Sequence, residues 1–423
     1  MTESIDTNCK EPQRSKGYFI FLFIFLCLME IFDTYTTNLP NLIVSKVQED
    51  FLGIGDDAKA VMALVVGLAS IGMLFVVINQ FLADIFGRRI FLFITMLGMG
   101  VASVFIYLSQ NIVQYGIALF FLYIFFSSDI WTIYISEECD KKRRGINLNL
   151  VLVFGVLGVA LVTLSRWIFL PEVGTSNWKG VTYIAFLAIP LSFLVIFIKE
   201  TRKFVELKKS RTTKPSAKES FKKILKPFNK KYRKHFIPLI IMSFIQGLNY
   251  TFIQLGEDFI SDHLSSNQVN WVVTGMGVAA IAGYLITGFF SDRKGRKPLF
   301  LIYSIMLPCS IAIAVFGATI PAISFVALLI GGSLASLSYW SLGVVNRLVA
   351  IEILPTDVRG TGTSIRSVLT ALGTILGGIF SYKLFPLIQQ GPTFFLFSLL
   401  LLLNIPLILI FIKETKSKEL ELS

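Results

Sequence analysis

Twelve continuous apolar stretches in this chain are each long enough to cross a lipid bilayer. They lie at 17–42, 58–82, 89–108, 112–136, 146–168 and 180–198, and then at 236–260, 268–290, 298–316, 320–351, 361–384 and 393–412. A helix of ~20 residues, rising ~1.5 Å per residue, spans a hydrocarbon core of ~30 Å. The apolar residues are continuous and do not alternate, which favours helices over the strands of a barrel. The sequence therefore predicts an all-α integral membrane protein with twelve transmembrane helices, arranged as six plus six.

The composition agrees with a chain embedded in lipid. Hydrophobic residues make up 54% of the 423 residues, and charged residues make up only 16%. A water-soluble domain of this size has too little interior to bury so much apolar surface. We therefore expect the bilayer itself to be a partner of the chain.

The basic residues fall mostly on one side of the predicted membrane. The net charge is +12. Most lysines and arginines lie in the loops 1–16, 83–90, 137–145, 199–235, 292–297, 356–366 and 413–423. The opposite side carries Lys46, Lys59, Arg166, Lys179 and Lys383. This asymmetry follows the positive-inside rule, so both termini are expected in the cytoplasm and the chain in the cell membrane. A nucleic-acid partner is not expected, because the charge sets orientation.

The apolar stretches and basic loops divide the chain into five parts. We expect a cytoplasmic tail at 1–16, a six-helix bundle at 17–198, a basic cytoplasmic linker at 199–235, a second six-helix bundle at 236–412 and a cytoplasmic tail at 413–423. Within the linker, Ser216–Phe228 has apolar residues near one face and fits a helix lying along lipid headgroups. A solvated basic tether fits the same composition.

Three short motifs each occur twice, in the same order, where an apolar stretch meets a basic loop. They are Asp-x-x-Gly followed by two cations at 84–89 and 292–297, a Glu seven residues before an Arg-Gly pair (Glu137 with Arg144, Glu352 with Arg359), and Ile-Lys-Glu-Thr at 198–201 and 412–415. A repeat of membrane segments is typical of carriers built from two related halves. The duplication therefore points to transport.

These motifs resemble those of the major facilitator superfamily over essentially the whole chain. Glu137 with Arg144-Gly145 and the segment 352–362 are similar to helix junctions of the sugar porters and related metabolite:proton symporters. The two Lys-Glu-Thr tails resemble motifs that those porters carry after helices six and twelve. The resemblance implies two six-helix bundles around a central cavity lined by helices one, four, seven and ten. It also implies transport by alternating access.

Charged residues at the cytoplasmic helix ends are predicted to form a gate. A carboxylate that ends one helix can pair with an arginine of the neighbouring junction in one state and release it in the other. Simple anchoring of these side chains at the lipid headgroups is the alternative. The gate residues are Asp84, Arg88, Glu137, Arg144, Asp292, Arg296, Glu352 and Arg359.

Three carboxylates inside the predicted membrane are candidates for binding the coupling proton. A charge near the bilayer centre costs at least ~2.5 kcal/mol, so each such residue suggests a function. Glu30 and Asp33 share a face of the first helix, and Asp129 lies in the fourth. Phe32-Asp33 resembles the first-helix motif whose Asp takes the proton in proton-coupled sugar porters. Those porters pair that Asp with a fourth-helix Arg, but residues 112–136 contain no Arg or Lys.

Polar and aromatic side chains at cavity depth are candidates for binding substrate. Polar faces occur on the first, fourth, seventh and eleventh apolar stretches, the last through Thr363, Ser367, Thr370 and Thr374. Packing or lipid contact is the alternative for the aromatic residues. The substrate candidates are Thr37, Gln246, Asn249, Tyr250, Gln254, Trp340 and Asn346. Glu257 and Asp258, near the outer end of the seventh stretch, are expected to face water.

The sequence contains no pattern that indicates an enzyme or a cofactor. Four scattered cysteines and two histidines support neither a disulfide framework nor a metal site. Nucleophile and phosphate-loop patterns are also missing from the sequence. We expect a monomer whose partners are a small-molecule substrate, protons and lipid.

The sequence favours a proton-coupled symporter of a small polar solute, such as a sugar. A carrier or proton-driven exporter of organic cations is the alternative, because the cavity is rich in carboxylates. Anionic substrates fit less well, since Arg347 is the only candidate for binding an anion. A membrane sensor that does not transport should carry an additional soluble domain, and no stretch is long enough for one.

Overall fold

The computed structural model describes residues 15–125, 144–172, 176–201, 226–230, 232–354 and 356–414, together with Trp131, Tyr134, Ile135, Glu138, Phe204 and Val205. This part of the chain is almost entirely helical and contains no β-strand. The prediction of an all-α protein is therefore confirmed.

The helices of the N-terminal group span residues 16–197. They are α1 (Lys16–Asn38), η1 (Pro40–Leu42), α2 (Val44–Phe51), α3 (Asp56–Ala69), η2 (Ser70–Phe75), α4 (Val76–Phe86), α5 (Arg88–Leu108), α6 (Ile112–Phe125), α8 (Arg144–Phe169), η3 (Trp178–Leu187), α9 (Ala188–Phe193) and η4 (Leu194–Phe197). The η segments are 3₁₀ helices.

The helices of the C-terminal group span residues 226–411. They are η5 (Lys226–Phe228), α12 (Arg233–Ser261), α13 (Ser266–Lys294), α14 (Arg296–Ala318), α15 (Ser324–Ile353), α16 (Thr356–Ile388), α17 (Gln390–Leu399), η6 (Leu400–Leu403) and α18 (Asn404–Phe411).

Ten helices among the described residues are long and apolar enough to cross a membrane, and two shorter apolar helices accompany them. Their outward surfaces carry large apolar side chains; Phe105 is 54% exposed, Leu285 57% and Ile410 68%. Such surfaces are stable in lipid and not in water. The protein is a multi-pass membrane protein.

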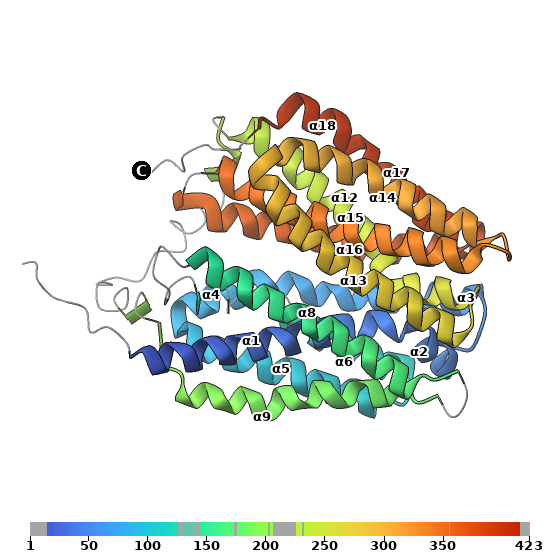
Figure 1. Cartoon of the computed structure of the whole chain (residues 1–423), viewed down its shortest axis with the longest axis horizontal. Helices are drawn as coiled ribbons and strands as arrows, with labels where there is room; N and C mark the ends of the chain where they lie inside the picture. Colours follow the sequence, from blue (N-terminus) through green and yellow to red (C-terminus); the bar gives the residue numbers. More distant parts are fainter. Residues whose placement is uncertain are drawn as a thin grey trace, which may run out of the picture.

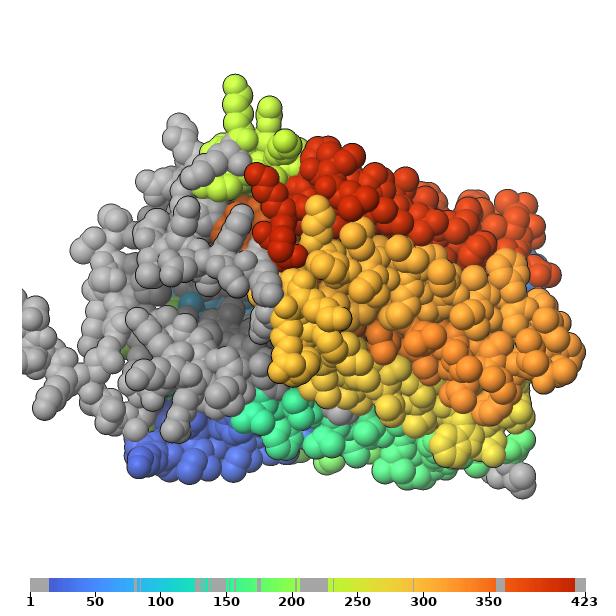
Figure 2. All heavy atoms as spheres, turned by 45° about the horizontal axis from the view of Figure 1, so that its top comes forward, coloured from blue at the N-terminus to red at the C-terminus, as the bar shows by residue number. Residues whose placement is uncertain are grey.

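The two groups lie side by side (Figure 1). α1 begins and α18 ends at the same end of the molecule, drawn on the left, whereas α2 lies at the opposite end. The space-filling view shows the C-terminal helices packed directly on the N-terminal ones along the right-hand part of the molecule (Figure 2). We call the end that contains α2 the distal end.

The groups approach most closely where α3 crosses α16. A Cβ atom added to Gly67 would lie 2.8 Å from the Cα of Gly378, a distance that real Cβ atoms do not adopt. Glycine at both positions therefore lets the two backbones touch. Ala63 lies at the same crossing, because its carbonyl is 2.7 Å from the Cβ position of Gly378.

Candidate functional site

The first helix carries two of the three predicted proton-binding carboxylates. Glu30 is 7% exposed and lies against α8, where a Cβ atom on Gly155 would be 2.9 Å from its Cγ. Asp33 is partly buried and accepts a hydrogen bond from Thr37 Oγ1 at 3.5 Å. The structure thus places one carboxyl in a helix–helix contact and the other beside a candidate substrate residue. Asp129, the third candidate, lies outside the described residues.

α12 and α15 bring four of the predicted substrate residues together. The ring of Tyr250 stacks on that of Tyr339 at 5.6 Å and meets Trp340 edge-on at 6.3 Å. Gln246 Nε2 donates to the Tyr339 carbonyl at 3.3 Å. One turn nearer the N-terminus of α12, Asn346 Nδ2 donates to Ser243 Oγ at 3.0 Å. The result is a buried cluster of aromatic rings and amides.

Two other predicted substrate residues point elsewhere. Asn249 Nδ2 donates to the Phe397 carbonyl of α17 at 3.0 Å, so it joins two helices of the C-terminal group. Gln254 Nε2 instead crosses to the N-terminal group, where it donates to Ser70 Oγ at 3.2 Å and to the Tyr123 hydroxyl at 3.1 Å. Gln254 therefore belongs to the contact between the groups.

The hydroxyls predicted to form a polar face on α16 bond to backbone carbonyls. Ser367 Oγ donates to the Thr363 carbonyl at 3.1 Å. Thr370 donates to the Arg366 carbonyl, and Thr374 donates to Gly247 of α12 at 3.2 Å. Much of this face therefore serves helix packing.

The predicted cytoplasmic gate is described only in part. Arg296, at the start of α14, donates from Nη2 to Glu352 Oε1 at 2.8 Å and from Nε to the same oxygen at 3.0 Å. This forked pair links α14 to the end of α15 within one group. Arg88 is 7% exposed at the start of α5. The side chains of Asp84, Arg144, Asp292 and Arg359, and all of Glu137, lie outside the described residues.

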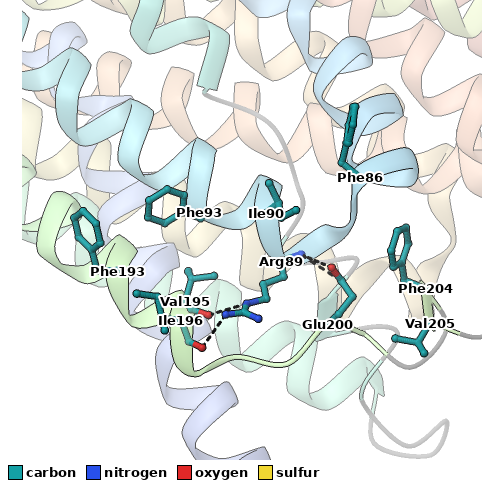
Figure 3. A pocket seen from close by; sticks show the side chains of 10 residues that line it. All are labelled: Phe86, Arg89, Ile90, Phe93, Phe193, Val195, Ile196, Glu200, Phe204 and Val205. Atoms are coloured by element: carbon teal, nitrogen blue, oxygen red, sulfur yellow. Dashed lines mark hydrogen bonds between the residues drawn. The ribbon is translucent and has the colours of Figure 1, made fainter. Parts of the chain in front are cut away.

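The repeated Lys-Glu-Thr tails supply a carboxylate to the start of α5 and of α14. Glu200 accepts from the backbone N–H of Arg89 at 3.2 Å (Figure 3) and from that of Arg88 at 3.1 Å. Glu414 accepts from the backbone N–H of Arg296 at 2.9 Å and of Lys297 at 3.1 Å. These N–H groups have no partner within their own helices. The repeated sequence marks both tails but does not indicate that their carboxylates cap these two helices.

Glycine precedes each of these helices for two physical reasons. The φ angle is +116° at Gly87 and +96° at Gly295, in the region that favours glycine. A Cβ atom at either position would also collide with the carboxylate of Glu200 or Glu414. The repeated glycine thus makes both the turn and the space for the capping carboxylate.

A groove of about 830 Å³ lies beside the first of these caps, between α5 and η4 (Figure 3). Four phenylalanines line it: Phe86, Phe93, Phe193 and Phe204. The guanidinium of Arg89 bonds to the carbonyls of Val195 at 3.2 Å and Ile196 at 2.8 Å. This apolar groove is lined by the N-terminal group and by Glu200, Phe204 and Val205, which follow it in the chain, and it does not lie between the two groups.

Comparisons with known proteins agree with the fold. The model of the family described as "Sugar (and other) transporter" matches residues 19–423. The chain belongs to this family. It is a transporter of the major facilitator superfamily and not an enzyme.

Two relatives and one solved structure are similar to this chain over most of its length. A putative niacin/nicotinamide transporter of Bacillus subtilis is 24% identical over 92% of this chain and 95% of its own length. The cis,cis-muconate transport protein of Acinetobacter baylyi is 24% identical over 81% of each chain. The crystal structure of a D-xylose-proton symporter has a TM-score of 0.75, with 17% identity, covering 95% of this chain and all of that one. That last likeness concerns the fold alone.

The structure of this transporter corrects the expectation that Glu257 and Asp258 face water. Both are buried, at 2% and 3% exposure. Glu257 pairs with Arg166, and Asp258 accepts a hydrogen bond from Gln390 Nε2 at 3.1 Å. The expectation was wrong because it rested on position near a helix end. An arginine within the apolar run 146–168 was the signal for a buried partner.

Arg366 corrects a second expectation. The sequence analysis placed it in a cytoplasmic loop and left Arg347 as the only candidate for binding an anion. The structure instead buries Arg366 in α16, at 7% exposure. The transporter therefore has a second candidate for binding an anion, a cation buried within α16.

Proposed function

We propose that this transporter moves a small polar metabolite by alternating access, coupled to protons through the carboxyls of α1. The proposal includes twelve transmembrane helices in two six-helix bundles, a monomeric chain in the cell membrane, and both termini in the cytoplasm. On this topology the distal end is the outer face, because α1 begins and α18 ends at the opposite end.

Two carboxyls on one membrane-length helix are the observation that carries the proposal. Glu30 and Asp33 lie in the second half of α1, more than one turn from its end at Asn38. A carboxyl kept in such a place is costly and marks a proton or ion path. Asp33 is partly buried and bonded to Thr37, a candidate substrate residue, so a proton on Asp33 would change the surroundings of the substrate.

The substrate is proposed to bind beside the cluster of Tyr250, Trp340 and Gln246. Aromatic rings with amide groups suit a sugar or a related metabolite, since the rings pack on its faces and the amides bond to its hydroxyls. Carboxylate metabolites are the second candidate. The buried cation Arg366 favours them, and the relatives from Bacillus and Acinetobacter are described as carriers of niacin/nicotinamide and cis,cis-muconate.

The cytoplasmic gate remains a proposal for Asp84, Glu137, Arg144, Asp292 and Arg359. The neighbouring pair of Arg296 and Glu352 supports it, because it shows that the loop after α13 contacts the end of α15. Rearrangement of such pairs would accompany opening of the cytoplasmic side.

The substrate class is tested by uptake into proteoliposomes under an imposed pH gradient. D-Xylose, nicotinate, cis,cis-muconate and a quaternary amine are compared with and without the gradient. Gradient-stimulated uptake of the sugar supports the first candidate, and uptake of either acid supports the second. If the gradient stimulates uptake of the amine alone, the protein is instead a carrier of organic cations. If the gradient accelerates none of them, proton symport of these classes is excluded.

The coupling residues are tested with Asp33→Asn and Glu30→Gln. We expect Asp33→Asn to reduce gradient-driven accumulation by at least about tenfold and to spare exchange of solute, because a neutral amide cannot release a proton. Glu30→Gln tests whether the carboxyl packed against α8 shares this role. Asp57→Asn is the control, since it removes an exposed carboxylate from the first turn of α3. Normal accumulation in both α1 variants would remove these residues as coupling sites.

A further inference from the structure

The distal end contains a buried ion pair that joins the two groups of helices. Arg166 Nη2, in the last turn of α8, lies 2.7 Å from Glu257 Oε1 of α12, and the two side chains are 3% and 1% exposed. Neither belongs to a duplicated motif. An ion pair so deeply buried is stable only when its remaining hydrogen-bonding groups also find partners.

The remaining groups of this pair are bonded by three surrounding segments. Glu257 accepts from Ser45 N at 2.8 Å and from Ser45 Oγ at 2.7 Å, at the start of α2. Arg166 Nε donates to Asn270 Oδ1 of α13 at 2.7 Å, and its Nη1 donates to the Leu42 carbonyl of η1. The carboxylate thus sits at the N-terminus of α2 and the guanidinium at the C-terminus of α8, where helix dipoles favour each charge.

Every one of these contacts except that with Leu42 crosses from one group to the other. Nearby, Trp167 Nε1 donates to Thr274 Oγ1 of α13 at 3.3 Å, and Asn270 Nδ2 donates to the Leu170 carbonyl at 3.2 Å. The distal end can therefore open only if Glu257 leaves both Arg166 and Ser45. Separating a buried pair exposes two charges that must be solvated again, so the contact acts as a discrete switch.

The pair is also aligned with the proposed substrate site. Tyr250, Gln254 and Glu257 follow one another at i, i+4 and i+7 on α12, so they share one face of the helix. The segment η1 packs against α12, with the Asn41 side chain near that of Tyr250, and Leu42 of the same segment binds Arg166. The segment 40–45, which continues directly from α1, therefore contacts both the aromatic cluster and the ion pair.

We propose that Arg166 and Glu257 form the latch that holds the outer face closed, and that the segment 40–45 connects this latch to the substrate site. The two are positioning residues, because they act by tying α8 to α12 and not by touching the substrate. The proposal rests on the proposed function, since a latch has a role only in a carrier whose two faces open alternately.

The latch is tested by labelling a reporter cysteine from outside, which needs no knowledge of the substrate. Ser70→Cys is introduced into a chain whose native cysteines are replaced by serine. Ser70 is fully buried and lies beyond the Gly67–Gly378 crossing, so a membrane-impermeant maleimide reaches it only when the outer face opens. We expect Glu257→Gln and Arg166→Gln each to accelerate labelling by at least about tenfold. The double variant should label more slowly than either single one, because it leaves no unpaired buried charge.

Two control variants distinguish a failure of the latch proposal from a failure of the proposed orientation in the membrane. Glu49→Gln removes an ion pair with Lys46 (2.7 Å) that lies within α2 alone, and it should leave the labelling rate unchanged. Ile54→Cys, at a residue that is 85% exposed between α2 and α3, reports the topology and should label from outside in every background. If Ile54→Cys does not label, the proposed orientation is wrong and the proposed function must be revised.

The latch is overturned if Ile54→Cys labels but the single variants leave Ser70→Cys as slow as the parent, or if Glu49→Gln accelerates it equally. Should the neutral variants fail to reach the membrane, Glu257→Asp keeps the charge and shortens the side chain by one methylene. It is then expected to give an intermediate labelling rate, and an unchanged rate would equally overturn the latch.

Discussion

Glu200 and Glu414 show how single residues hold the two halves of this transporter in related shapes. Each carboxylate accepts from two backbone N–H groups at the start of a helix that begins directly after a glycine. The positive end of the helix dipole adds to these bonds. The acid and the glycine therefore recur together, because the carboxylate can reach the helix start only where a residue without a Cβ atom leaves space for it.

Removing one of these caps should destabilise the protein measurably. We expect Glu200→Ala to lower the free energy of unfolding by about 1–2 kcal/mol, because two N–H groups of α5 lose their acceptor. Thermal unfolding in detergent measures the change. Glu172→Ala, which removes an exposed acid from the loop after α8, should have little effect. Equal unfolding temperatures for the two variants would argue against the cap.

Residues that recur could be predicted from the sequence, but their partners could not. The repeated motifs located Arg296, Glu352 and both capping acids. The sequence did not reveal that Glu414 reaches α14, because the two are more than a hundred residues apart. Glu257 was misassigned for the same reason, since its environment is set by Arg166 from the other half.

At the scale of elements, the α3–α16 crossing depends on two glycines. Their backbones touch in a way that leaves no room for a side chain. Helix pairs in membranes associate through such close packing, because lipid supplies little hydrophobic drive between helices. The crossing also lies between the distal end and Ser70, so its integrity affects closure of that face.

Enlarging one of these glycines should push the two helices apart. We expect Gly67→Val to lower the free energy of unfolding by about 1–3 kcal/mol, as overpacking does in a well-packed interior. It should also raise labelling of Ser70→Cys from outside. Gly288→Val is the matched control, because a Cβ atom at Gly288 meets nothing within 4 Å. A similar effect of both variants would indicate a general effect of valine within a helix and not lost closure.

Long apolar stretches predicted most helices well, and short polar elements were missed. α12, α13 and α16 cover the stretches 236–260, 268–290 and 361–384. The first stretch was drawn to residue 42, but α1 ends at Asn38 and Pro40 starts a 3₁₀ turn. α2 was not predicted, since eight residues with mixed polarity give no membrane signal. Most of Ser216–Phe228, the possible surface helix, lies outside the described residues.

At the scale of the whole molecule, the two groups are joined at the distal end by contacts of different depth. The buried pair of Arg166 and Glu257 lies inside, and Lys59 pairs with Asp262 in a more exposed position, with side chains 10% and 34% exposed. Because these two contacts lie at different depths, they can separate one after the other. A complete rigid-body movement of one group against the other would break both.

Fixing the outermost contact should stop the transport cycle. In Lys59→Cys/Asp262→Cys, a short bis-methanethiosulfonate reagent, which joins the two thiols through disulfides, is expected to abolish gradient-driven uptake of the solute that the proteoliposome comparison identifies, and reduction should restore it. A linker is preferable to a direct disulfide, whose geometry is narrow. Lys46→Cys/Glu49→Cys, which links residues of one helix, should retain uptake. Continued transport by the crosslinked Lys59/Asp262 variant would mean that this end need not separate.

The pairing of Arg166 with Glu257 also has a consequence for how this chain can evolve. Losing either residue alone would leave an unpaired charge buried in the protein, whereas losing both would be tolerated far better. The two positions, in different groups of helices, should therefore vary as a unit across closely related sequences. Substitutions at position 166 should be accompanied by compensating ones at position 257, so a comparison of close relatives can detect the latch without any experiment on the protein.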